Sequence, residues 1–159
     1  DLVLAYAPAS FDAPAAEGFE VEREVKPLRG DALKAGGRAV VTLTVRTKQD
    51  RTFVALEDAL PAGWEIVDTT FATEGQEDAR ALSDEGERGW SWGSFQRAER
   101  YDDRIQVFAD YLTAGTHRWT YLVQATTPGR YHLPAAVVEQ MYEPEVFGRT
   151  ASGEAAVSR

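Results

Sequence analysis

Side chains that could perform catalysis or bind a metal are few in this sequence. The 159 residues contain two histidines, His117 and His132, and no cysteine. Neither histidine has a second histidine nearby or the His-Glu-x-x-His spacing that binds zinc. Ser94, in "WGSFQ", lacks the Gly-x-Ser-x-Gly pattern that presents a nucleophile between a strand and a helix. The sequence therefore predicts ordinary surface or edge histidines, no metal, no cofactor and no enzyme activity.

The stretch "YDDR" places two carboxylates beside an aromatic residue and a cation, at Tyr101, Asp102, Asp103 and Arg104. Paired carboxylates can serve as an acid and a base, but neighbours in an extended segment point to opposite faces. A turn explains the stretch better, with an aspartate as its cap and the arginine bonded to a carboxylate or carbonyl. We expect a structural polar motif.

Two other groups of residues raise binding as an alternative. The acids of residues 72–89, "ATEGQEDARALSDEGERG", lack the Asp-x-Asp-x-Asp-Gly order of a calcium loop, so we expect an exposed excursion. The four tryptophans could form a sugar-stacking platform, although Trp119 lies on the apolar register of its strand and tryptophan more often belongs to a core. They are Trp64, Trp90, Trp92 and Trp119.

The charge balance bears on the class of partner. Lys and Arg total 17 against 26 Asp and Glu, a formal net charge of -9. Such a surface repels phosphate backbones and anionic lipid, which argues against nucleic-acid binding and against membrane contact by this chain. No apolar run approaches the roughly 20 residues of a membrane-spanning helix.

Alternating apolar and polar residues predict the elements that must position these groups. Residues 19–25 place Phe19, Val21 and Val25 on one face, and further strands are expected at 38–47, 51–60, 64–67, 128–142 and 153–158. Residues 105–112 and 117–127 are expected to pair as a hairpin across "TAGT". Many short strands with little helical periodicity predict an all-β, antiparallel β-sandwich.

The length suits one domain. Residues 1–17 hold prolines and many alanines and predict a linker or an edge strand around residues 2–6, so the folded domain is expected at 18–159. Because the sequence begins at Asp1 without a start methionine, we expect it to be part of a longer protein.

Several segments together resemble one family, the C-terminal macroglobulin domain of bacterial alpha-2-macroglobulins, which corresponds to the receptor-binding domain of animal members. The resemblance runs from Gly18 to the end, in the family's order. It lies in "GFEVEREV", "DALPAGWEIVD", "AERYDDRIQVFADYLTAGTHRWTYLVQATTPGRYHLPAAVVEQMYEP" and "FGRT". It implies a sandwich of the macroglobulin type, which is related to immunoglobulin-like folds.

The resemblance also implies a function. The parent would be a large protease-trapping inhibitor, used in bacterial defence, that is cut in a bait segment, rearranges and in many members captures the protease through a Cys–Gln thioester. With no cysteine, this chain would be an accessory that packs against the thioester domain of the same polypeptide. The expected location is the periplasm or cell envelope, with an inner-membrane lipoprotein as one form of the parent. The alternative is an immunoglobulin-like adhesion or carbohydrate-binding module.

The stretch "QMYEP" is the element that the resemblance places over the thioester. A thioether and a flat aromatic ring, Met141 and Tyr142, would exclude water and amines from the acyl carbon, and Pro144 would stiffen the loop. In the alternative interpretation Met141 fills a gap in the core and Tyr142 is an edge residue. The alternation of the preceding strand breaks at this pair, as at a loop with a function.

Overall fold

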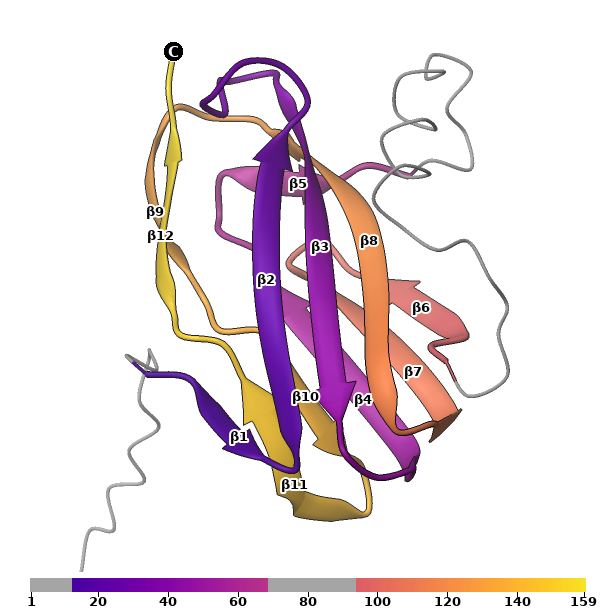
Figure 1. Cartoon of the computed structure of the whole chain (residues 1–159). Coiled ribbons are helices and arrows are strands. Elements are labelled where there is room, and N and C mark those ends of the chain that lie inside the picture. Colours follow the sequence, from indigo (N-terminus) through magenta and orange to yellow (C-terminus); the bar gives the residue numbers. More distant parts are fainter. Residues whose placement is uncertain (1–12, 69–93) are drawn as a thin grey trace, which may run out of the picture.

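The computed structural model describes residues 13–68 and 94–159, which form only strands and their connections (Figure 1). The predicted all-β class is confirmed. The expected edge strand at residues 2–6 and the acidic excursion at 72–89 lie outside the described residues. The strands are β1 (Ala15–Glu17), β2 (Phe19–Pro27), β3 (Arg38–Thr47), β4 (Arg51–Ala59), β5 (Trp64–Ile66), β6 (Arg97–Arg100), β7 (Arg104–Leu112), β8 (Gly115–Ala125), β9 (Gly129–Leu133), β10 (Val137–Gln140), β11 (Glu143–Arg149) and β12 (Gly153–Val157).

Two larger sheets face each other, as Figure 1 shows. One has six strands in the order β1-β11-β10-β4-β7-β6, and the other has four in the order β2-β3-β8-β5, while β12 and β9 form a separate pair. Neighbouring strands pair antiparallel throughout. The predicted antiparallel sandwich is therefore confirmed. The described part of the chain has no helix long and apolar enough to cross a bilayer.

The core lies between the two sheets and follows the period of two in the sequence. In β2, Phe19 and Val21 are buried, while Glu20 and Glu22, which alternate with them, are exposed. Leu43 of β3, Leu56 of β4 and Ile105 of β7 are buried almost completely in the same cluster. Burying one such side chain contributes about 1.5–3 kcal/mol, so this alternation is what holds the sheets together.

The expected hairpin between residues 105–112 and 117–127 is wrong. β7 pairs with β4 and β6, whereas β8 pairs with β3 and β5, so the connection crosses from one sheet to the other. Gly115 makes the turn with a φ of 136°, and the Asp50 carboxylate accepts a 2.8 Å hydrogen bond from the Ala114 N–H. A tight turn with glycine suits either a hairpin or an arch between sheets, so the local sequence does not distinguish them.

Candidate functional site

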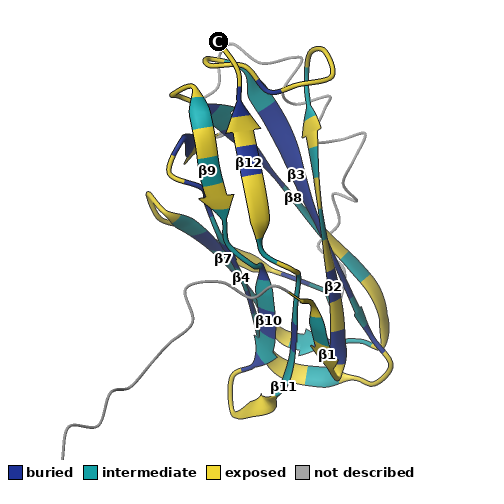
Figure 2. Cartoon of the chain, turned by 90° about the vertical axis from the view of Figure 1, so that its left-hand side faces the viewer, coloured by how far each residue is buried: buried dark blue, intermediate teal, exposed yellow. Residues whose placement is uncertain are grey.

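Met141 and Tyr142 form the turn between β10 and β11, at the lower end of the molecule in Figure 1. Figure 2 shows this turn exposed, and the exposed fractions are 48% for Met141 and 75% for Tyr142. Met141 therefore does not fill a gap in the core. Large apolar side chains at a protruding turn are available to a partner surface.

Phe53, near the start of β4, completes an apolar group at this end. It is 47% exposed, and its ring meets the Tyr142 ring edge to face, with centroids 5.2 Å apart and an interplanar angle of 86°. Its carbonyl accepts a 2.8 Å hydrogen bond from the Met141 N–H. We call Phe53, Met141 and Tyr142 the apolar tip. Sequence reasoning missed Phe53, because its neighbours in the chain gave it the appearance of an ordinary strand residue.

Pro144 lies in β11 and not in the turn itself. The register between β10 and β11 shifts here, since Gln140 pairs with Glu143 and the next pair is Glu139 with Phe147. Strand β1 pairs only with residues 147–149 of β11. A proline has no N–H to donate and suits such an irregular, uncovered stretch. The predicted stiffening by Pro144 would therefore act on the strand that follows the tip.

The predicted polar motif forms the turn between β6 and β7. The Tyr101 N–H donates to the Arg104 carbonyl at 2.9 Å, and the Arg104 guanidinium lies 3.5 Å from the Asp103 carboxylate. It also lies 3.7 Å from the Glu57 carboxylate of β4. Asp102 is exposed in the same turn. Because Arg104 pairs with Ala59 at the end of β4, this turn lies at the opposite end of that strand from the apolar tip.

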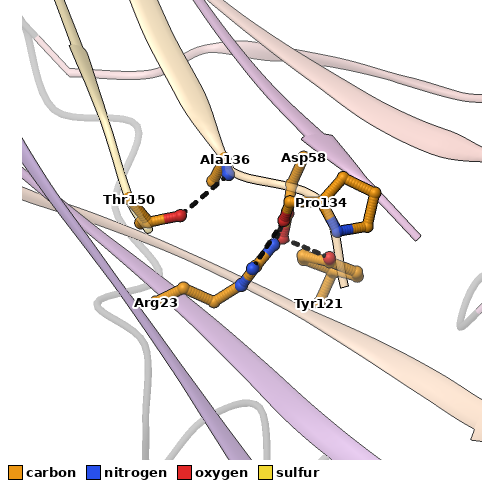
Figure 3. Close-up of polar contacts among 6 residues, drawn as sticks. All are labelled: Arg23, Asp58, Tyr121, Pro134, Ala136 and Thr150. Atoms are coloured by element: carbon orange, nitrogen blue, oxygen red, sulfur yellow. Dashed lines mark hydrogen bonds and ion pairs between the residues drawn. The ribbon is translucent and has the colours of Figure 1, made fainter. Parts of the chain in front are cut away.

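A buried polar network that sequence reasoning missed crosses the core (Figure 3). The Arg23 guanidinium lies 2.5 Å from one oxygen of Asp58 and donates to the Pro134 carbonyl at 2.7 Å. The Tyr121 hydroxyl donates to the other Asp58 oxygen at 2.6 Å. Burial raises the pKa of the Asp58 carboxyl, while Arg23 and Tyr121 act against that increase. Burial also raises the pKa of the Tyr121 hydroxyl well above its ordinary value.

This network joins the two sheets and does not line a surface site. Arg23 belongs to β2 and Tyr121 to β8 of the four-stranded sheet, whereas Asp58 belongs to β4 of the six-stranded sheet. The side chains of Arg23 and Asp58 are only 6% and 1% exposed. Structural ion pairs shift pKa values as active sites do, and this one is closed to solvent. The signal that could have revealed the network is a charged residue at an apolar-register position in each of two strands, Arg23 in β2 and Asp58 in β4.

The other candidates from the sequence do not form a site in the described part of the chain. Trp64 is buried and Trp119 packs against the core, so neither contributes to a sugar platform, and Trp90 and Trp92 lie outside the described residues. One ring nitrogen of His117 lies 2.7 Å from the Thr113 carbonyl oxygen. Among residues 13–68 and 94–159, no three His, Cys, Asp or Glu side chains are grouped so as to hold a metal ion.

Comparison with known proteins places this fold in a family. The profile described as "Bacterial Alpha-2-macroglobulin MG10 domain" matches residues 18–145. "Alpha-2-macroglobulin homolog" of Nostoc sp. is 41% identical over 98 residues, which cover 62% of this chain and 5% of that protein. "Circularly permutated Ras protein 2" of Dictyostelium discoideum is 36% identical over 121 residues, which cover 76% of this chain and 3% of that protein.

Solved structures agree with that family. A tyrosine-to-glycine mutant of Salmonella alpha-2-macroglobulin superposes with a TM-score of 0.76 at 28% identity, covering 96% of this chain and 10% of that one. The same protein after reaction with methylamine gives a TM-score of 0.74 with equal identity and coverage. The chain thus spans a tenth or less of the proteins it matches here. The family match over residues 18–145, on a fold shared with these structures, shows that the chain belongs to the bacterial alpha-2-macroglobulin MG10 domain family.

Proposed function

We propose that this chain is a non-catalytic domain of a protease-trapping alpha-2-macroglobulin that packs against the thioester domain of the same polypeptide and shields the thioester before activation. The observation that carries the proposal is the apolar tip, where three large side chains are between 47% and 75% exposed. An exposed apolar group of this kind on a domain from a much larger protein marks a contact with a neighbouring domain.

The chemistry of a thioester explains what such a contact would provide. Its acyl carbon reacts with water and amines, so it persists only in a site from which both are excluded. Aromatic rings bury large areas, and a thioether adapts to irregular surfaces. Tyr142 and Met141 supply these two properties side by side in one turn. The tip therefore suits a cover over a reactive group that another domain carries.

Capture of a protease and the cellular location would be properties of the whole parent protein. The target protease would meet the parent through its bait segment and thioester, and this chain would respond when the parent changes shape. The proposed location is the periplasm or cell envelope, where an inhibitor of this kind would serve bacterial defence. Fractionation of cells that express the parent, with detection of this domain by antibody, would place it; recovery in the cytosol would contradict the proposal.

The 159-residue chain alone is expected neither to hydrolyse proteins nor to capture a protease covalently. It has no cysteine and hence no thioester, and the described residues show no activated nucleophile beside a base. The measurement is incubation with several proteases followed by denaturing electrophoresis. The parent protein serves as the positive control, and a band of the combined mass with the 159-residue chain would overturn the assignment.

Replacing both Met141 and Tyr142 by alanine in a thioester-containing parent is expected to raise methylamine uptake several-fold or more without any protease, because the cover over the acyl carbon is removed. The melting temperature of the 159-residue chain should change little, since truncating exposed side chains usually alters stability slightly. Methylamine incorporation is measured beside melting.

The control for this pair is Glu145→Ala, which removes an exposed polar side chain from the following strand. It should leave both readouts near those of the wild type. If the double variant melts much lower while its methylamine uptake stays unchanged, the tip is a structural element and does not shield the thioester.

A further inference from the structure

Phe53 has an unusual backbone conformation. Its φ is +52°, and it is the only residue other than glycine with positive φ in the part of the chain that the structure describes. Side chains with a Cβ rarely adopt this region, and for a bulky residue such a value is a genuine outlier. Backbone strain persists where the surrounding structure imposes it, and it occurs preferentially at sites with a function.

The strand around Phe53 shows what this conformation changes. Thr52 pairs with Tyr111 and Val54 with Ala109, whereas Phe53 is not paired with a residue of β7. Val54 is fully buried next to it, while Phe53 itself is half exposed. The backbone therefore departs from regular pairing at one residue and returns at once. A residue required only for packing between the sheets would not need this departure.

The backbone carbonyl and the ring of Phe53 both contact the turn that follows β10. Its carbonyl accepts the Met141 N–H at 2.8 Å, and its ring meets Tyr142 edge to face with centroids 5.2 Å apart. Edge-to-face pairs at this separation are attractive beyond the area that they bury. Tyr142 is 75% exposed, so few other contacts restrain its ring. Phe53 is thus placed to fix the direction of the Tyr142 side chain.

We propose that Phe53 is a positioning residue, which holds the Tyr142 ring in the orientation that meets the neighbouring domain. The role rests on the proposed shielding function. Without Phe53 the Tyr142 ring would sample several rotamers, and docking would have to order it. Pre-ordering an exposed aromatic side chain removes that loss of entropy from the contact.

Three variants of the 159-residue chain test the positioning directly. Phe53→Ala removes the ring and keeps the unfavourable φ, Phe53→Gly removes the ring and relieves the φ, and Phe53→Tyr keeps the ring. The measured quantities are the NMR shifts of the Tyr142 ring protons and the melting temperature. We expect the Tyr142 shifts to move toward random-coil values in the alanine and glycine variants and to stay in the tyrosine variant. The glycine variant should melt at or above the alanine variant.

The same three changes in the thioester-containing parent test the consequence. Methylamine uptake should rise about two- to tenfold for alanine and glycine, the factor that an aromatic pair of this geometry contributes. The tyrosine variant should react like the wild type. A purely structural role predicts instead that uptake follows the melting temperature, so a stable glycine variant with wild-type uptake would overturn the proposal.

Tyr142→Ala in the same parent separates the two ideas. If it leaves methylamine uptake unchanged, the shielding function fails, and with it the contribution of Phe53 to shielding, whatever the NMR shifts show. If it raises uptake while Phe53→Ala does not, shielding stands and the positioning role is overturned. Unchanged Tyr142 ring shifts in Phe53→Ala would overturn the positioning role independently of any thioester.

Discussion

Replacing Arg23 with alanine is expected to lower the free energy of unfolding by about 3–5 kcal/mol, because it leaves the Asp58 carboxylate buried without its charged partner. The side chain of Asp58, the last residue but one of β4, is only 1% exposed. The Tyr121 hydroxyl would still donate to it, but one neutral donor does not replace a guanidinium. Denaturant unfolding of the 159-residue chain, followed by tryptophan fluorescence, measures the change.

Two controls identify burial as the cause. Arg130 and Glu154 lie at the same 2.5 Å separation as Arg23 and Asp58, but their side chains are 78% and 50% exposed. Arg130→Ala should therefore have a much smaller effect, because exposed ion pairs contribute little. Combining Arg23→Met with Asp58→Leu should be less destabilising than Arg23→Ala alone, since no unpaired charge remains. Equal losses from Arg23→Ala and Arg130→Ala would contradict this account.

The location of the network shows how the fold and the apolar tip are related. Asp58 and Phe53 belong to the same strand, β4, and the network fixes that strand against β2 and β8 of the facing sheet. Polar groups in a core are satisfied in only one arrangement of their partners. We therefore expect the network to define how the two sheets are placed, and hence where the tip projects from the molecule.

Alternation in the sequence was sufficient to predict most of the strands but not their partners, and β1, β6 and β11 form where no strand is expected. Strands are expected at residues 38–47 and 51–60, and the structure has β3 at Arg38–Thr47 and β4 at Arg51–Ala59. The sequence predicts a hairpin where β7 crosses to β8, because inward-facing residues alternate in the same way in one sheet or in two. Pairing depends on contacts between distant segments, and the pattern of a single sequence does not show them.

The candidate site was predictable only where the family resemblance or a break in the pattern indicated it. Met141 and Tyr142 stood out because the resemblance places them over the thioester, and the alternation of β10 breaks at the same pair. Phe53 did not, since a phenylalanine in a strand suggests a core, and its exposure follows from a backbone conformation that its residue type disfavours. Arg23 and Asp58 lie on the apolar register, but a charged residue at such a position is also compatible with the edge of a sheet, so the sequence alone does not indicate a partner in the facing sheet.

Adding one methyl group at Gly148 is expected to destabilise the domain by about 1–3 kcal/mol, the usual range for overpacking. Gly148 is buried in β11 between Val138 of β10 and Ala16 of β1. A Cβ there would lie 2.4 Å from the Phe19 carbonyl oxygen and 2.9 Å from its carbonyl carbon. These are backbone atoms of the first residue of β2, so relief requires one strand to move and not merely a side chain to turn.

Gly153→Ala is the matched control, because it also lies in a strand but a Cβ there would meet no atom within 4 Å. It should leave stability unchanged or raise it slightly, through the smaller entropy of the unfolded chain. Thermal melting of both variants measures the difference. Because β11 begins directly after Tyr142, a shift of this strand away from Phe19 should also move the apolar tip. Gly148→Ala in a thioester-containing parent should therefore raise methylamine uptake. Gly153→Ala should leave methylamine uptake unchanged. Equal melting temperatures of the two variants would show that β11 can move away from β2 without loss of stability. The close approach at Gly148 would then not be what holds the tip in place.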